Sequence, residues 1–171
     1  MEREAIEITG KLKENRKSNI LGFTKLDIAE IVNEMNQVLA NYSVHYQKLR
    51  NFHWNVTGGD FFEIHERFEE QYNEAKVAVD DLAERIRVFN QTPLSTMKEY
   101  LDNSQIKESV TTLTATEMVR EIIKDYRVLL DSLLSLTELA MEKGDIGTEV
   151  LAKNLMQSIE KKYWMMSAFS K

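Results

Sequence analysis

Four long segments of this sequence repeat apolar residues at steps of three and four positions, and this repeat constrains the fold more than any other feature. The segments cover residues 25–54, 60–89, 114–143 and 148–168. Such steps place apolar side chains on one face of an α-helix. The chain has one Pro and six Gly, so few positions interrupt a helix. The repeat therefore predicts four amphipathic helices, the third opened by a capping box of Thr114 and Glu117.

The connection between the second and third predicted helices, residues 90–113, is too long for a simple helical hairpin. Within it, "STMKEYL" predicts a short helix over residues 95–101, capped by Ser95. Two helical hairpins joined by one long crossover predict an all-α, ferritin-like four-helix bundle with a short helix in that crossover. We expect the bundle domain to span residues 20–171 and residues 1–19 to form a flexible tail.

The composition limits the compartment and the chemistry. Because the chain has no Cys, it has no disulfide, no thiolate metal site and no Cys nucleophile, which suits a reducing compartment. No apolar run approaches the roughly 20 residues that a membrane span needs. The N-terminus also lacks the apolar region of a secretory signal. We therefore expect a cytoplasmic protein that is not associated with a membrane.

The charge distribution disfavours nucleic acid as a partner. The net charge is −6, and an acidic body repels DNA unless a basic segment overrides it. The tail is mixed, with five basic and four acidic side chains and a net charge of +1. These are Arg3, Lys11, Lys13, Arg16 and Lys17 against Glu2, Glu4, Glu7 and Glu14. We expect DNA binding at physiological salt to be weak or absent.

Polar side chains on the second predicted helix include candidate metal ligands. His65 and Glu69 are four residues apart, as are Asp80 and Glu84, so each pair shares a helix face. Imidazole nitrogens and carboxylate oxygens suit Fe, Mn or Zn. His53 ends the first predicted helix, and the turn "NVTGGD" can bring it close to His65. The sequence thus contains a histidine-rich group and an acidic group.

Helix geometry keeps these two groups apart within one chain. His65 and Asp80 are 15 residues apart, roughly 22 Å at about 1.5 Å per residue, whereas a metal–ligand bond is about 2 Å long. The two groups of one chain therefore cannot bind the same ion. Either they are unrelated, or a second chain completes the site. An antiparallel two-fold arrangement would create two identical sites per dimer.

Three of the candidate ligands also have an ordinary structural interpretation. His53 lies at the edge of an apolar helix face, where histidines commonly pack, and packing is our expectation for His45 as well. Glu69 and Glu84 fit a solvated helix face, and Glu84 can pair with the arginines that follow it. Spacing alone leaves both interpretations open.

The segment "NFHWNVTGGDFFEIHERFEEQYNEAKVAVDDLAERI" resembles the signature region of the Dps mini-ferritins, the DNA-protecting proteins of starved cells. The similarity is specific over residues 45–108 and extends to the whole chain at the level of architecture. It implies a hollow dodecamer that oxidises Fe(II), preferentially with hydrogen peroxide, and stores the ferric mineral. It also implies that His53 and His65 of one subunit and Asp80 and Glu84 of a neighbour form a ferroxidase site at a two-fold interface.

The resemblance implies roles for four further residues. Glu69 is expected to assist the metal ligands, and Trp54 is expected to lie close to the site. The turn "KGDIGTEV" resembles the segment that lines the three-fold pores of the family, where Asp145 and Glu149 would form acidic rings that attract Fe(II). The alternative for Asp145 is that it caps the fourth helix. Iron is the expected metal, with Zn or Mn as substitutes.

Three other functions compete with this interpretation. A DNA-binding, nucleoid-protecting protein with little ferroxidase activity is disfavoured by the nearly balanced tail. A bundle without metal chemistry is disfavoured by the match of both histidines and both acids to the family spacing. A di-iron oxygenase usually has Glu-x-x-His on its helices, and this chain has no such motif. A ferroxidase that stores iron is the leading hypothesis.

Overall fold

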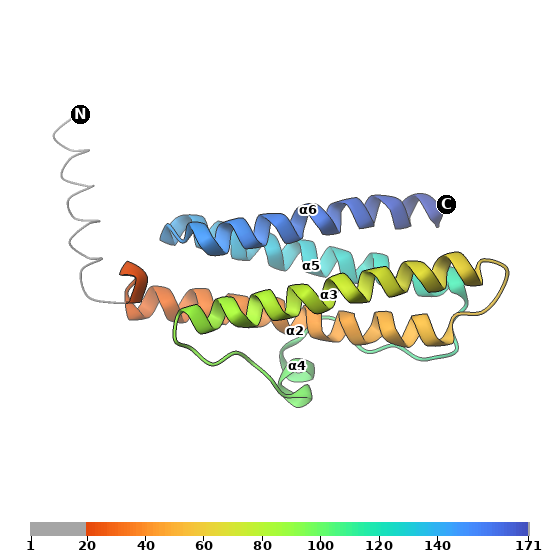
Figure 1. Cartoon of the computed structure of the whole chain (residues 1–171), viewed down its shortest axis with the longest axis horizontal. Helices are drawn as coiled ribbons and strands as arrows, with labels where there is room; N and C mark the ends of the chain where they lie inside the picture. Colours follow the sequence, from red (N-terminus) through yellow and green to blue (C-terminus); the bar gives the residue numbers. More distant parts are fainter. Residues whose placement is uncertain (1–19, 171) are drawn as a thin grey trace.

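Residues 20–170 are described by a computed structural model, and within them every regular element is a helix (Figure 1). The tail predicted over residues 1–19 lies outside the described residues. The elements are η1 (Ile20–Gly22), α2 (Lys25–Asn55), α3 (Phe61–Val88), α4 (Met97–Asn103), α5 (Ala115–Lys143) and α6 (Ile146–Phe169). The predicted all-α bundle with a short helix in its crossover is confirmed.

The helices begin where capping residues supply acceptors for free N–H groups. Thr24 accepts from the N–H of Asp27, and the Asp27 carboxylate accepts from the N–H of Thr24, so α2 starts with a capping box. The capping box predicted for Thr114 and Glu117 is present at the start of α5. These local bonds satisfy donors that have no partner within the helix.

Two predicted helix starts were wrong by two residues. The short helix begins at Met97 with Thr96 as its cap, rather than with Ser95, because Glu99 lies three residues after Thr96 and completes a capping box there. The last helix begins at Ile146 instead of residue 148, because Asp145 accepts from the N–H of Thr148 and caps it.

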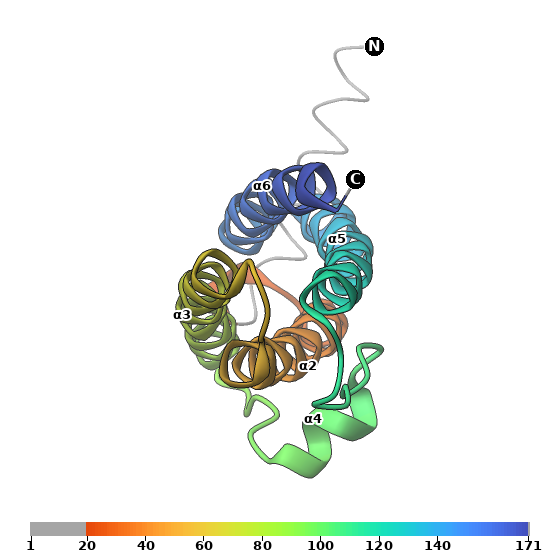
Figure 2. The same ribbon diagram turned by 90° about the vertical axis from the view of Figure 1, so that its right-hand side faces the viewer.

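The four long helices surround one apolar core, and α4 lies outside the bundle beside α2 (Figure 2). The hairpins α2–α3 and α5–α6 pack internally, and α2 packs against α5 to join them. The core extends along the whole bundle and includes Met35, Leu39, Phe68, Leu82 and Leu133, which are fully buried. No helix within residues 20–170 combines the length and the apolarity that crossing a bilayer requires.

A charged cluster interrupts this core between α2 and α5. The carboxylate of Asp125 accepts a hydrogen bond from the Lys48 ammonium at 2.7 Å and contacts His45 Nδ1 at 3.0 Å. All three side chains are buried. His45 is therefore a packing residue, as predicted, but one that also has an ionic partner. Burial lowers the pKa of His45, and the neighbouring Asp125 opposes this effect.

Candidate metal centre

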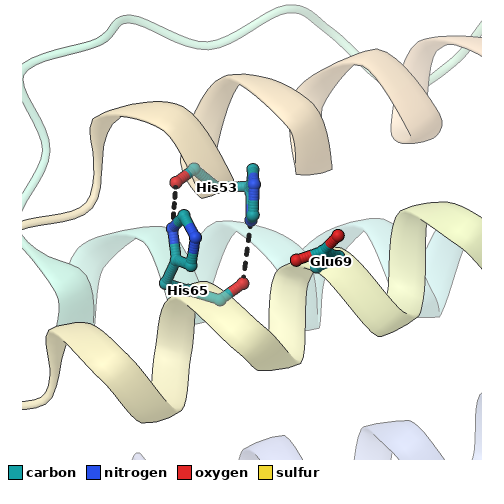
Figure 3. A group of neighbouring side chains, drawn as sticks. All are labelled: His53, His65 and Glu69. Carbon is teal, nitrogen blue, oxygen red and sulfur yellow. Dashed lines mark hydrogen bonds between the residues drawn. The ribbon is translucent and has the colours of Figure 1, made fainter.

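The turn between α2 and α3 brings His53 and His65 together. Gly58 adopts a φ of 115° in this turn, a conformation that side chains other than glycine rarely tolerate. Val56 closes the end of α2 by donating its N–H to the carbonyl of Phe52. The two imidazole rings then stack, with centroids 3.8 Å apart and planes 24° apart (Figure 3). The predicted convergence of the two histidines is present.

Reciprocal hydrogen bonds determine which nitrogen of each ring faces the site. Nδ1 of His53 lies 2.9 Å from the carbonyl oxygen of His65, and Nδ1 of His65 lies 2.8 Å from the carbonyl oxygen of His53. A carbonyl oxygen only accepts, so each Nδ1 carries a hydrogen and donates it. Nε2 is then the nitrogen that can bind a metal on each ring. Metal-binding histidines are commonly oriented by such a bond from the other nitrogen.

Glu69 completes a group of three convergent ligands from one chain. It lies one turn after His65 on α3, and ligand atoms of His53, His65 and Glu69 all lie within 4.8 Å of one another. His53 is buried, His65 is partly buried and Glu69 is exposed. The group is therefore open on its carboxylate side. Two imidazoles and one carboxylate with an open side form a suitable partial shell for Fe or Zn.

Aromatic side chains enclose the histidines. Phe61 stacks on His65 at a centroid distance of 5.0 Å, and Tyr72 meets the His53 ring edge-on at 5.3 Å. The Tyr72 hydroxyl also donates to Glu69 Oε1 at 3.3 Å. Partial burial and the Glu69 carboxylate raise the pKa of Tyr72, so its phenol remains a proton donor at neutral pH.

Tyr72 is a site residue that the sequence reasoning missed. Its spacing matches the apolar stripe of the second predicted helix, so the sequence indicates a packing residue at this position. A signal was nevertheless present, since Tyr72 lies three residues after Glu69 and seven after His65 on the same face of α3. The dual contact with His53 and Glu69 depends on the packing of α2 against α3.

The acidic pair lies apart from this group. Asp80 and Glu84 are exposed on the C-terminal half of α3, and no metal-capable group within residues 20–170 includes either of them. The alternative pairing of Glu84 with Arg85 or Arg87 is also not found in this part of the chain. Arg85 bonds Asp145, and Arg87 bonds the carbonyl of Gln91. Both carboxylates therefore face away from any intramolecular partner described here.

Trp54 follows His53 but faces another part of the surface. Its ring is 59% exposed and lies beneath the Arg50 guanidinium, 4.7 Å from the ring centroid. It lines a groove of about 400 Å³ between α2 and the crossover, together with Met97 and Tyr100. Its predicted closeness to the metal stays a prediction about the assembled protein.

Asp145 acts as a helix cap, the second of the two alternatives that the sequence left open. It is 1% exposed, accepts from the Thr148 N–H at 3.2 Å and pairs with the Arg85 guanidinium. Gly147 leaves room for that guanidinium, because a Cβ there would lie 2.8 Å from Arg85 Cζ. A buried, paired carboxylate presents little charge to a pore. Glu149 pairs with Lys153 and is partly exposed, so it is the remaining pore candidate.

Comparisons with known proteins agree with this architecture. The family model described as a ferritin-like domain matches residues 32–171. General stress protein 20U of Bacillus subtilis is 41% identical over 140 residues, which cover 82% of this chain and 97% of that protein. DNA protection during starvation protein 2 of Bacillus anthracis is 41% identical over 140 residues, covering 82% of this chain and 96% of that protein.

A solved structure of a Dps protein has the same architecture as this chain. The crystal structure of the Dps protein from Vibrio cholerae O1 superposes with a TM-score of 0.87 at 35% identity, covering 90% of this chain and 96% of that one. That protein is described as a member of a broad superfamily of ferritin-like diiron-carboxylate proteins. The chain therefore belongs to the Dps family of ferritin-like proteins.

Proposed function

We propose that this protein is a ferroxidase and iron store, which oxidises Fe(II), preferentially with hydrogen peroxide, at sites completed between two subunits. The observation that carries the proposal is the convergent group of His53, His65 and Glu69, which is half a metal site and is open on one side. Asp80 and Glu84 of a second subunit would supply the other half. Membership in a family of iron-storing, protective proteins supports this role.

The donor set explains how the site would act on its substrate. Fe(II) would bind to the two Nε2 atoms, and the carboxylates would stabilise the higher charge of Fe(III), since hard oxygen anions favour the more highly charged ion. One hydrogen peroxide takes one electron from each of two Fe(II) ions and forms two hydroxide ions. Because both electrons are consumed together, little hydroxyl radical is released. Zn(II) or Mn(II) would compete for the same donors.

The two-fold completion of the site needs at least a dimer, and membership in the Dps family extends the proposal to a larger assembly. We propose a hollow dodecamer that stores the ferric product, with Glu149 at an acidic entry pore, acting in the cytoplasm. No observation in residues 20–170 favours the alternative, a nucleoid-associated DNA-protecting role. Residues 1–19, whose charge led us to expect weak or absent DNA binding, lie outside the described residues.

Mixed assemblies test whether the site is shared between subunits. One variant carries His53→Ala and His65→Ala, the other carries Asp80→Ala and Glu84→Ala, and the two are refolded together in equal amounts. Each variant alone should be inactive. In the mixture half of the two-fold dimers pair unlike chains, and each such dimer has one complete site, so about a quarter of the peroxide-dependent activity should return. Stopped-flow measurement of Fe(III) formation gives the recovered fraction.

The control for this test is the same two proteins assembled separately and then combined without refolding, which should stay inactive. Activity that does not return on joint refolding, although native mass spectrometry shows mixed assemblies, would mean that the histidine and acidic groups do not share an ion. If the unmodified chain were also inactive, a helical bundle without metal chemistry would be the better interpretation of the protein.

Replacement Tyr72→Phe should lower the maximal rate of Fe(II) oxidation several-fold. The variant keeps the ring that packs against His53 and loses only the hydroxyl that bonds Glu69, a contribution of about 0.5–1.5 kcal/mol for one hydrogen bond. The matched control is Tyr46→Phe, because Tyr46 contacts the Tyr72 ring but not the ligands. An equal effect of both changes would assign Tyr72 a packing role only.

A further inference from the structure

Between α3 and α6 the bundle contains a cavity, open to solvent on one side, that the proposed iron chemistry does not use. Its volume is about 250 Å³. The backbones of α3 and α6 stay farther apart than those of the other neighbouring long helices. Across the gap, Ala75 and Ala78 of α3 face Leu155 and Ile159 of α6. The cavity exists because the methyl groups of these two alanines cannot fill the space that larger side chains would occupy.

His45 provides a hydrogen-bond acceptor on the wall of this cavity. The Asp125 carboxylate accepts a hydrogen bond from the Lys48 ammonium at 2.7 Å. That carboxylate can only accept, so His45 Nδ1 carries the hydrogen of their 3.0 Å bond. Nε2 of the same ring then has a lone pair. His45 is 2% exposed and lines the cavity, and no hydrogen bond to its Nε2 is formed within residues 20–170.

The other walls are largely apolar. Tyr42 and Tyr126 contribute their aromatic rings, and the Tyr126 hydroxyl is already occupied by a bond to Gln71 Oε1 at 2.7 Å. Two of the charged groups that line the cavity pair with each other on its outer side, whereas the third, the exposed Asp81, forms no ion pair within residues 20–170. Lys162 Nζ lies 2.6 Å from Glu74 Oε2, and Ser158 donates to the same carboxylate oxygen.

These walls select the class of ligand. An anion would find no free cation, because Lys48 and Lys162 are each already paired with a carboxylate. A metal would lack a ligand set here, because the group of three metal-capable side chains within residues 20–170 is that of His53, His65 and Glu69. An apolar ligand with one hydrogen-bond donor satisfies both the walls and Nε2.

We propose that this His45 cavity binds a small neutral aromatic molecule with one hydroxyl group, the phenol class, whose hydroxyl donates to His45 Nε2. The volume is sufficient, since an engineered apolar cavity of about 150 Å³ accommodates benzene. The binding is independent of iron and of the ferroxidase proposal.

The test uses phenol as the probe, benzene as the matched ligand without a donor, and the full-length, metal-free protein. Calorimetric titration should show one phenol per chain, and phenol should raise the unfolding temperature in a concentration-dependent manner. Benzene should bind about tenfold more weakly, the difference that one hydrogen bond makes. In His45→Leu, phenol should lose this advantage and bind no better than benzene.

A second variant separates this cavity from other binding surfaces. Ala78→Leu fills the cavity and should abolish the binding of both ligands, whereas Ala168→Leu, the same change at an exposed position of α6, should leave both unaffected. Circular dichroism and native mass establish that each variant is folded. Absence of phenol binding to the unmodified protein, or undiminished binding to Ala78→Leu, would overturn the proposal.

Discussion

Replacing His53 and His65 together by alanine should lower the rate of peroxide-dependent Fe(II) oxidation by about 100-fold or more. The change removes both nitrogen ligands from each half-site, and even the loss of groups that only orient metal ligands costs about 10–100-fold. Glu69 would remain, with the Asp80 and Glu84 proposed to come from a second subunit, but no nitrogen ligand would be left to bind Fe(II). Stopped-flow absorbance of the ferric product, with Fe(II) and hydrogen peroxide supplied at fixed concentrations, measures the rate.

The third histidine of the chain provides the matched control. His45 is buried in the core and bonds Asp125, away from the metal centre. His45→Gln retains a donor for that carboxylate and should oxidise Fe(II) at the rate of the unmodified protein. Native mass spectrometry should show the same assembly for all three proteins. A double variant at His53 and His65 that oxidises Fe(II) as fast as the unmodified chain would contradict the assignment of the site.

The second large effect concerns stability. Asp125→Asn should lower the free energy of unfolding by about 3–5 kcal/mol, the cost of leaving one partner of a buried ion pair without its counterion. Here that partner is the Lys48 ammonium, whose side chain is 4% exposed. Denaturant unfolding measures the change. Because the stability of an oligomer depends on subunit concentration, both proteins must be compared at the same concentration.

An exposed ion pair serves as the control for this experiment. Lys98 and Asp102 are four residues apart on α4, and their side chains are 84% and 57% exposed. Asp102→Asn should change the unfolding free energy by less than about 1 kcal/mol, because water already solvates both charges. If Asp125→Asn cost no more than Asp102→Asn, the buried cluster would not stabilise the junction of α2 and α5.

Much of the fold was predictable because its determinants are local. The steps of three and four residues predicted each long helix, and the capping box of Thr114 and Glu117 marked the start of α5 correctly. Where two caps competed, the sequence reasoning selected Ser95, whereas α4 uses Thr96 because Glu99 lies at the spacing that a capping box requires. Such errors move the predicted start of a helix by only one or two residues, because the free energies of neighbouring caps differ by little more than one hydrogen bond.

The candidate site was predictable only in part. Spacing placed His65 and Glu69 on one helix face, and helix rise separated them from Asp80 and Glu84, so the residues alone left two possibilities, unrelated groups or a site completed by a second chain. It could not assign Nδ1 and Nε2, because those roles depend on carbonyl groups of the opposite helix. It also counted Tyr72 as apolar packing, since the contact with His53 exists only after α2 and α3 pack.

By itself, then, the sequence determined the helices, their order and the chemical types of the candidate ligands, because periodicity, capping and spacing act over a few residues. The tertiary structure alone decided the long-range pairs. His45 and Lys48 meet Asp125 across the core, and Arg85 buries the carboxylate of Asp145 at the start of α6. Partners so far apart in the chain leave no local pattern in the sequence. They pair because the packing of the helices brings them together and removes their charges from water.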